Sequence, residues 1–338
     1  MNPFFSVIVA TCRGSYPFLR FPKRHVIENI IENCKKQTCQ DFELIIVDLL
    51  YDYRREEVAA LCNNVSFPVL HVKDKSSIFR DLKLIRIAAA KNTGLLYARG
   101  KCVIFSDDGQ DWSKDAFERI RPWGERGVGA TCRLHRDKGD GPYEEDSRWA
   151  AYGINGSDRT KTVRADGVGY LGGTLSMVPL KAALKCNGWD EMFDGSRQLE
   201  DSDMAMRLGT TGLQIALEGH PRVVEHELSG CAHGEVETGF FVKCNGAYIY
   251  PIWDRGKQSR TRANNKLLTE PQLDSFMRGK CWKLDGEGHC SVSGDLCEEE
   301  WDDRELIDIY RDERLVFDLE KMRISRSWEK VDQDPLLR

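Results

Sequence analysis

Short, continuously apolar segments alternate with helical segments over about the first 106 residues of this chain. The apolar segments are rich in β-branched and aromatic side chains and lie at residues 4–10, 42–48, 69–72 and 101–105. Helical segments separate them, at residues 23–37, 54–63 and 81–98. A strand that is apolar along its whole length is buried on both faces. The alternation therefore predicts an α/β fold with a mostly parallel central sheet, Rossmann-like in this half and flanked by helices.

Polar side chains that can bind ions or ligands, or react with them, stand where these predicted strands end. Thr11 and Arg13 follow the first strand, Asp48 ends the second, and Asp107 and Asp108 follow the fourth. Ligands of open parallel sheets bind beyond the carboxyl ends of the strands. We therefore expect these residues to share one site.

Asp107 and Asp108 can be interpreted in two ways. Two carboxylates at a strand end suit Mg²⁺ or Mn²⁺, which prefer oxygen ligands and keep water or substrate phosphates as the remaining ligands. The sequence Asp107-Asp108-Gly109 is also ordinary turn chemistry. Their position beside the other strand ends favours the metal and diphosphate interpretation.

Two features further along the chain add candidate chemistry. Glu200 and Asp201 open a helical segment, where acids complement the helix dipole, but one of them can also serve as a general base for an acceptor hydroxyl. His226 follows an apolar strand and is either a structural histidine or a metal ligand from the far side of the site.

The β/α rhythm changes after residue 123. Residues 124–169 are rich in Gly, Asp, Arg and Ser and predict long loops or an irregular insertion over the site. We expect strands at 172–178, 213–217 and 222–226, and a mainly helical or irregular extension at 241–338. The predicted organisation is one domain at 1–240, made of a first half (1–123), the insertion (124–169) and a second half (170–240), followed by that extension.

Composition excludes several classes of protein. The net charge of −5 does not indicate a nucleic-acid partner, and no run of about 18 apolar residues predicts a membrane-spanning helix. The first residues have no signal-peptide pattern, so the twelve cysteines predict mostly reduced thiols in a cytoplasmic protein.

Two late segments carry their own alternatives. Arg255 and Lys257 belong to a basic segment at 253–262 that is either a solvated loop or a mobile lid over a diphosphate. A structural Zn²⁺ site at Cys281, Cys290 and Cys297 is the alternative to free thiols, although these cysteines lack a Cys-x-x-Cys pair.

Several segments together resemble glycosyltransferase family 2, whose members have the GT-A fold, and the resemblance covers about residues 4–230. The most specific segment is 188–195, Gly-Trp-Asp-Glu-Met-Phe-Asp-Gly, followed by Glu200-Asp201-Ser202-Asp203. Supporting segments are 6–11, 37–48, 90–100 and 105–108.

The resemblance implies a nucleotide-binding role for five residues. Asp48 resembles the acid that contacts the nucleobase, and Thr11 and Arg13 lie where the family's first loop meets the nucleotide. Lys91 and Asn92 resemble the segment that flanks the uridine and the sugar.

The resemblance also implies a catalytic and metal-binding set. Asp107 matches the first acid of the family's Asp-x-Asp motif, Asp201 matches the catalytic base of inverting members, and His226 resembles a histidine that completes the metal site in some relatives. The motif's second acid is replaced by Gly109. Asp108 or Asp111 then ligates instead, or Asp107, His226 and the diphosphate hold the metal.

The function implied is an inverting transfer of a sugar from a nucleotide-diphosphate sugar, by default a UDP-sugar, to an acceptor hydroxyl with Mn²⁺ or Mg²⁺. Two alternatives stay open at this point, a nucleotidyltransferase-like enzyme and a catalytically silent module that binds nucleotide sugars or glycans. The default acceptor is a glycan of polysaccharide biosynthesis, and a modified nucleobase is an alternative.

Overall fold

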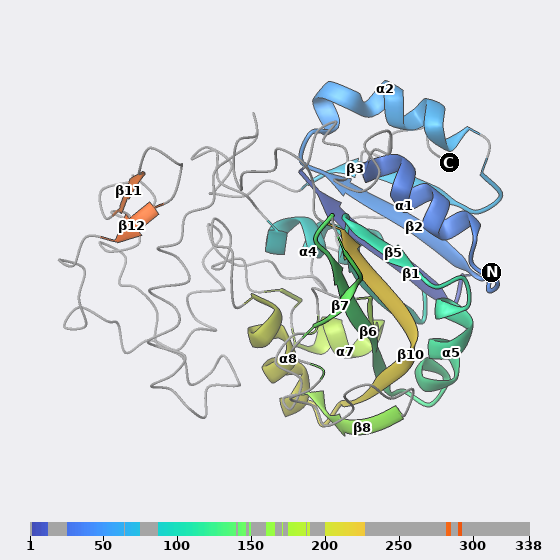
Figure 1. Ribbon diagram of the computed structural model, residues 1–338, viewed down its shortest axis with the longest axis vertical. Coiled ribbons are helices and arrows are strands. Elements are labelled where there is room, and N and C mark those ends of the chain that lie inside the picture. Colours follow the sequence, from blue (N-terminus) through green and yellow to red (C-terminus); the bar gives the residue numbers. More distant parts are fainter. Residues whose placement is uncertain are drawn as a thin grey trace.

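The computed structural model describes residues 2–12, 26–63, 65–74, 87–139, 141–146, 149, 160–165, 171, 175–186, 188–189 and 200–226, and two short strands at 282–284 and 290–292. In the described part, a ten-stranded mixed sheet runs through the molecule with helices packed around it (Figure 1). This architecture confirms the predicted α/β fold.

The first half of the sheet is parallel, with the strand order β3-β2-β1-β4. Its β1 and β2 are buried almost throughout, as their continuous apolar sequences predict. The strands are β1 (Phe5–Thr11), β2 (Phe42–Asp48), β3 (Val69–Lys73) and β4 (Cys102–Asp107). The helices between them are α1 (Val26–Lys35), α2 (Tyr51–Cys62) and α4 (Ile87–Tyr97).

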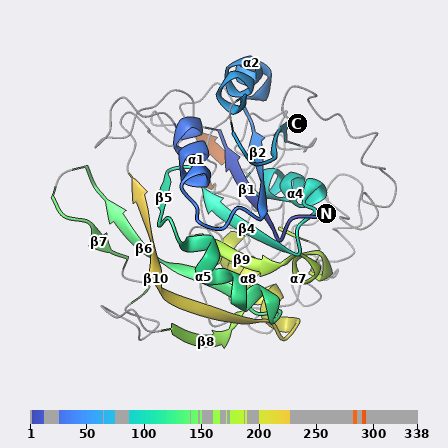
Figure 2. The same ribbon diagram turned by 90° about the vertical axis from the view of Figure 1, so that its right-hand side faces the viewer.

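Helices cover both faces of this half (Figure 2). Gly94 of α4 lies against Ile8 of β1, whereas Phe117 packs against Phe5 with ring centroids 5.8 Å apart. Because residues 5 and 8 of one strand point to opposite faces, α4 lies on the face opposite to Phe117. The core therefore lies on both sides of β1, and the polar strand ends meet at one edge.

The second half of the sheet is mixed and continues the order as β9-β6-β10-β5. Its strands are β5 (Gln110–Trp112), β6 (Gly129–Asp137), β7 (Glu144–Glu145), β8 (Thr160–Arg164), β9 (Ser176–Pro179) and β10 (Gln214–His226). Its helices are α5 (Ala116–Glu125), α7 (Leu180–Lys185) and α8 (Glu200–Thr210). A separate hairpin joins β11 (Trp282–Leu284) to β12 (Cys290–Val292).

The structure differs from the sequence expectation at β6, which lies in the segment for which long loops were expected. Ala130, Cys132 and Leu134 are fully buried, and they alternate with the polar Thr131 and Arg133. Alternation with a period of two is typical of a strand, but the surrounding sequence is rich in Gly and Asp, which is typical of loops, so the alternation was not recognised. β6 lies between β9 and β10, so this segment contributes a central strand.

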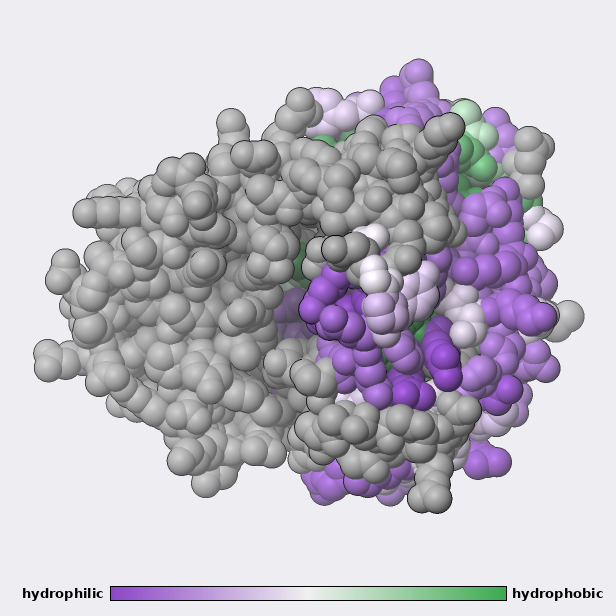
Figure 3. All heavy atoms as spheres, viewed as in Figure 1, coloured by the Kyte–Doolittle hydropathy of each residue, from purple (hydrophilic) through white to green (hydrophobic). Residues whose placement is uncertain are grey.

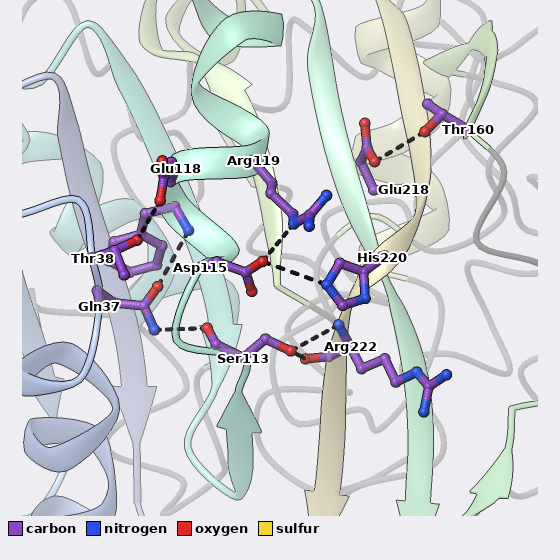
Figure 4. Close-up of polar contacts among 11 residues, drawn as sticks. Gln37, Thr38, Ser113, Asp115, Glu118, Arg119, Thr160, Glu218, His220 and Arg222 are labelled. Atoms are coloured by element: carbon purple, nitrogen blue, oxygen red, sulfur yellow. Dashed lines mark hydrogen bonds and ion pairs between the residues drawn. The ribbon is translucent and has the colours of Figure 1, made fainter.

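β10 is one long strand where two short ones were expected. Its pairing with β6 is interrupted between Glu218 and Arg222, a β-bulge. Ser113 fixes the bulge, because its hydroxyl donates to the Arg222 carbonyl at 2.8 Å and accepts from the Arg222 N–H at 3.0 Å (Figure 4). His220, inside the bulge, lies 3.4 Å from Asp115. Beyond the bulge, β10 pairs with β6 again as far as His226 and Asp137.

Among the described residues, none of the helices has the length and apolarity needed to cross a bilayer.

The backbone at Gly100 lies close to the backbone of β1. A Cβ at this position would lie 2.6 Å from the Ser6 nitrogen and 2.7 Å from the Phe5 carbonyl carbon, and backbone atoms in adjacent strands cannot move aside. At Gly124 an added Cβ would meet only side-chain atoms, the nearest being the Cys102 sulfur at 2.7 Å.

We expect Gly100→Ala to lower the free energy of unfolding by more than about 3 kcal/mol, and Gly124→Ala by about 1–3 kcal/mol. Urea denaturation of both variants measures the difference. Equal losses would contradict the close backbone packing at Gly100.

Candidate functional site

Charged side chains from three elements meet around one buried lysine at the carboxyl edge of the sheet. Lys91 of α4 is 4% exposed, and its Nζ lies 3.3 Å from Oδ1 of Asp201, in the first turn of α8. The same Nζ lies 4.0 Å from the centroid of the Trp189 ring, a cation–π contact. Asp107, at the end of β4, and Glu200 also act electrostatically on Lys91. Lys91, Asp107, Glu200 and Asp201, predicted separately, therefore lie together.

The carboxylates outnumber the single cation in this group. Burial, with smaller contributions from Asp201, Glu225 and Asp108, raises the pKa of Asp107 to about 7 despite the opposing effect of Lys91. Burial and the charge of Asp201 raise the pKa of Glu200 to about 8. Burial alone would lower the pKa of Lys91, but the attraction of the surrounding acids is larger and raises it. The cluster therefore carries more potential negative charge than its own residues neutralise, which is the electrostatic condition for attracting a cation.

Hydrogen bonds from α4 and α8 hold the backbone at Cys186, Gly188 and Trp189. Asn92 clamps Trp189, because its amide nitrogen donates to the Trp189 carbonyl at 2.9 Å and its amide oxygen accepts from the Trp189 N–H at 2.7 Å. Arg207 of α8 donates to the carbonyls of Cys186 and Gly188, each at 2.6 Å. Asn92 was expected beside the nucleotide, and in the structure it positions the tryptophan that covers Lys91.

His226 ends β10 beside two carboxylates. Its Nδ1 lies 2.7 Å from Oδ2 of Asp137, the last residue of β6, and its Nε2 lies 3.1 Å from Oδ2 of Asp111 in β5. The antiparallel pairing of β10 with β5 brings His226 beside Asp111, and the His226 N–H donates to the Gly109 carbonyl at 2.9 Å. A histidine supported through one ring nitrogen by a carboxylate, with the other nitrogen facing a second carboxylate, is the arrangement of many metal-binding histidines.

Asp108 has a different environment from Asp111. It is 5% exposed, and its Oδ2 accepts a hydrogen bond from the Thr11 hydroxyl at 2.7 Å. It therefore joins the ends of β1 and β4. Asp111, at 23% side-chain exposure, faces His226 and is better placed than Asp108 to replace the acid missing at Gly109.

Asp48 lies at the end of β2 in an ion-pair network in which Asp48 and His71 are fully buried and the Arg54 side chain is 11% exposed. Both nitrogens of one edge of Arg54 donate to it at 2.7 Å, and Nε2 of His71 lies 2.9 Å from its Oδ2. Arg54 also reaches the Thr11 hydroxyl at 3.5 Å. These bonds outweigh the effect of burial and hold the pKa of Asp48 below its usual range. Contacts therefore run from Asp108 through Thr11 and Arg54 to Asp48 and His71, across the ends of four adjacent strands.

Sequence reasoning had not singled out Arg54, His71 and Asp137. His71 stood in an apolar strand and Arg54 in a charged helix, so neither broke its local pattern. Asp137 ends a strand that was expected to be a loop. The signal that was available is the same for all three, a charged or titratable side chain at or near the end of a strand or in the first turns of the following helix.

Some predicted site residues lie outside the described part of the chain. These are Arg13, Arg255 and Lys257, and the proposed zinc ligands Cys281 and Cys297, while only the backbone of Cys290 is described. In the described part, no three His, Cys, Asp or Glu side chains gather in a group that could hold a metal ion by themselves. Figure 3 shows that the surface of the described residues on this side is mainly hydrophilic, with small apolar areas.

Comparisons with known proteins give the following similarities. A family model described as Glycosyl transferase family 2 matches residues 6–183. No sequence among the curated proteins matches the chain. S. aureus TarS 1–349 in complex with UDP-GlcNAc is similar with a TM-score of 0.48 and 14% identity, over 66% of this chain and 58% of that one. The mannosyltransferase PcManGT from Pyrobaculum calidifontis, in complex with GDP-Man and Mn²⁺, is similar with a TM-score of 0.44 and 17% identity, over 67% of this chain and 57% of that one. The chain thus spans less than two thirds of the length of either structure.

The Asp48 network generates a prediction about stability and pH. Asp48→Asn should lower the free energy of unfolding by about 3–5 kcal/mol near neutral pH, because it leaves the Arg54 charge without its buried partner. The folded pKa of Asp48 lies below the unfolded value of about 3.9, so its stabilising contribution is present above that value and is lost as the pH falls through the folded pKa.

The difference in unfolding free energy between wild type and Asp48→Asn should therefore shrink as the pH falls from about 5 to about 2. Urea denaturation at a series of pH values measures it. Asp52→Asn is the control, since Asp52 is 59% exposed and pairs only with the exposed Lys73, and we expect a change within about 0.5 kcal/mol. A difference for Asp48→Asn that stays constant down to about pH 2 would contradict the assigned network.

Proposed function

The chain belongs to glycosyl transferase family 2, and from this membership we propose that it transfers a sugar from a nucleotide-diphosphate sugar to an acceptor hydroxyl with inversion at the anomeric carbon. The observation that carries the proposal is the group of Asp107, Glu200 and Asp201 around Lys91 at the carboxyl edge of the sheet. Ligands of open α/β sheets bind at this edge. A UDP-sugar is the proposed donor by family resemblance.

Asp201 is the proposed general base. An inverting transfer is a single displacement in which the acceptor oxygen attacks the anomeric carbon, the bond to the diphosphate breaks, and the acceptor proton moves to a base. Asp201 is 13% exposed, so its carboxylate can meet an acceptor, and Lys91 holds it at 3.3 Å. Glu200 is 8% exposed and its raised pKa, about 8, keeps it protonated at neutral pH. Of the two adjacent acids, Asp201 is the more exposed and the one that contacts Lys91, so it is the one placed to accept a proton.

Mn²⁺ or Mg²⁺ is the proposed ion, and it would be held by protein groups together with the diphosphate of the donor. Asp111 and His226, 3.1 Å apart, and Asp107 would supply carboxylate oxygens and one imidazole nitrogen, and Asp137 orients the histidine. Few protein ligands are needed, since these ions keep waters and substrate phosphates. The bound ion would neutralise the negative charge that develops on the departing diphosphate. Asp108, first predicted as a ligand, supports this loop through Thr11.

A glycan acceptor of polysaccharide biosynthesis and a hexosyl donor are parts of this proposal that rest on resemblance, and localisation in the cytoplasm is a part that rests on the cysteine content of the sequence. A modified nucleobase is the alternative acceptor.

Donor binding is the first test. In a thermal-shift series with UDP- and GDP-sugars, we expect at least one donor to raise Tm. At a donor concentration 100 times Kd, binding adds about 2.7 kcal/mol to the free energy of unfolding. The shift should be larger with Mn²⁺, and Asp111→Asn should lose the Mn²⁺-dependent part. If no nucleotide sugar changes Tm with or without Mn²⁺, the proposed function is wrong.

Two neighbouring amide substitutions test the catalytic assignment. Asp201→Asn should lower the transfer rate by about 10²–10⁴-fold, because the amide cannot accept the acceptor proton. Glu200→Gln should stay within about tenfold of wild type, because the amide resembles the protonated acid present at neutral pH. Product formation and donor hydrolysis would be measured for both. Full transfer activity in Asp201→Asn would contradict the base assignment.

A further inference from the structure

The hydrogen-bonding capacity of Asp48 is fully used inside the protein. Its Oδ1 accepts from the Leu50 N–H at 2.8 Å and from Arg54 at 2.7 Å, and its Oδ2 accepts from Arg54 at 2.7 Å and contacts His71 at 2.9 Å. A carboxylate offers about four lone-pair positions. All are occupied, and Asp48 is 0% exposed, so a nucleobase N–H could bind it only by displacing Arg54 or His71.

His71, unlike Asp48, has a ring nitrogen left over for a hydrogen bond to a ligand. Its side chain is 0% exposed, and Nδ1 has no hydrogen-bond partner within the described structure. The low pKa of Asp48 keeps it an acceptor at neutral pH, so the contact at 2.9 Å places a ring N–H on Nε2 of His71. In the tautomer whose single ring proton lies there, Nδ1 offers a lone pair. A buried polar atom without a partner is costly to a fold and needs a physical explanation.

The position of His71 agrees with a ligand-binding role. It lies in β3, beside β2, and the contacts from Asp108 to His71 cross the ends of β4, β1, β2 and β3. Adjacent strands are about 4.8 Å apart, so this edge is about 14 Å long. The cluster around Lys91 and Asp107, which would face the diphosphate and sugar, lies toward one end, and His71 lies at the other.

We propose that His71, through Nδ1, accepts the ring N–H of the donor's nucleobase, and that Asp48 positions His71 without touching the nucleotide; this rests on the proposed function. The acceptor selects bases with a ring N–H beside a carbonyl group, as in uracil and guanine, over cytosine and adenine, which present a lone pair at the equivalent ring nitrogen. The Tyr51 ring lies 4.8 Å from the His71 ring, tilted by 50°. Because His71 is fully buried, a base reaches Nδ1 only if a covering group such as Tyr51 moves. Tyr51 is only partly buried, which leaves it room to move.

Two isosteric substitutions separate the two nitrogens of His71. The amide of Gln reaches the position of Nε2, so His71→Gln keeps the contact with Asp48 and loses the acceptor at Nδ1. The amide of Asn reaches the position of Nδ1, so His71→Asn keeps the acceptor and loses the contact with Asp48. One variant tests base recognition and the other serves as its structural control.

The experiment is isothermal titration of wild type and both variants with UDP, CDP, GDP and ADP, all with Mn²⁺, together with thermal unfolding. In wild type, the tighter of the two pairs UDP/CDP and GDP/ADP should show a preference of about tenfold for the base with the ring N–H. His71→Gln should reduce this preference to about twofold or less while keeping most of the wild-type Tm. His71→Asn should keep the preference and lower Tm.

Each other outcome is decisive. A tenfold preference that survives in His71→Gln, or a wild type that binds nucleotides without any preference, overturns the assignment of His71 but leaves the proposed function in place. If no nucleotide binds to wild type, the proposed function is wrong and the assignment falls with it. If His71→Gln does not fold, N3-methyl-UDP and 5-methyl-UDP replace it as probes of wild type. N3-methylation should weaken binding at least about tenfold and 5-methylation by less, and equal affinities would overturn the assignment.

Discussion

The organisation of this protein depends on the burial of β1, β2 and β4 on both faces. A strand in that position can carry almost no polar side chain along its length, so polar groups gather where the strands end. Thr11, Asp48 and Asp107 are the last residues of three adjacent strands, and the parallel register brings them to a single edge. The chemistry of the site is therefore a consequence of the same pattern that forms the core.

Buried charge is stabilised differently around Asp48 and around Lys91, the two parts of this edge. Around Asp48, every oxygen lone pair is matched by a donor from Arg54, His71 or the backbone, so the pKa is lowered. Around Lys91, one cation faces several carboxylates, so the pKa values of Asp107 and Glu200 rise. The first part is complete without a ligand, apart from Nδ1 of His71, whereas the second is left short of positive charge. In the first part a structural role suits Asp48 and Arg54 and only Nδ1 of His71 is left for a ligand, whereas the second part suits a cation and a reacting substrate.

The sequence was sufficient to predict the parallel half of the sheet, because apolar runs of strand length alternate there with helical periodicity. It was also sufficient to bring Lys91 and Asp201 into one site, through the resemblance of the segments around them. It was not sufficient for β6, where the buried residues include Ala130 and Cys132, which give a weak apolar signal. Nor did it place Arg54 and His71 beside Asp48, since that contact depends on how α2 and β3 pack beside β2, which no local pattern encodes.

Under the proposed function, Asp111 replaces the motif acid that is missing at Gly109. The carbonyl of Gly109 accepts the His226 N–H at 2.9 Å, so this position joins the acidic loop to β10. Two residues later, Asp111 lies in β5, paired with β10, and its carboxylate is 3.1 Å from His226. The antiparallel pairing fixes both side chains relative to each other, whereas a carboxylate on the turn itself would depend on the turn's conformation. An acid moved from a loop onto a paired strand is held more rigidly, and rigid placement is what a small divalent cation with strict geometry requires.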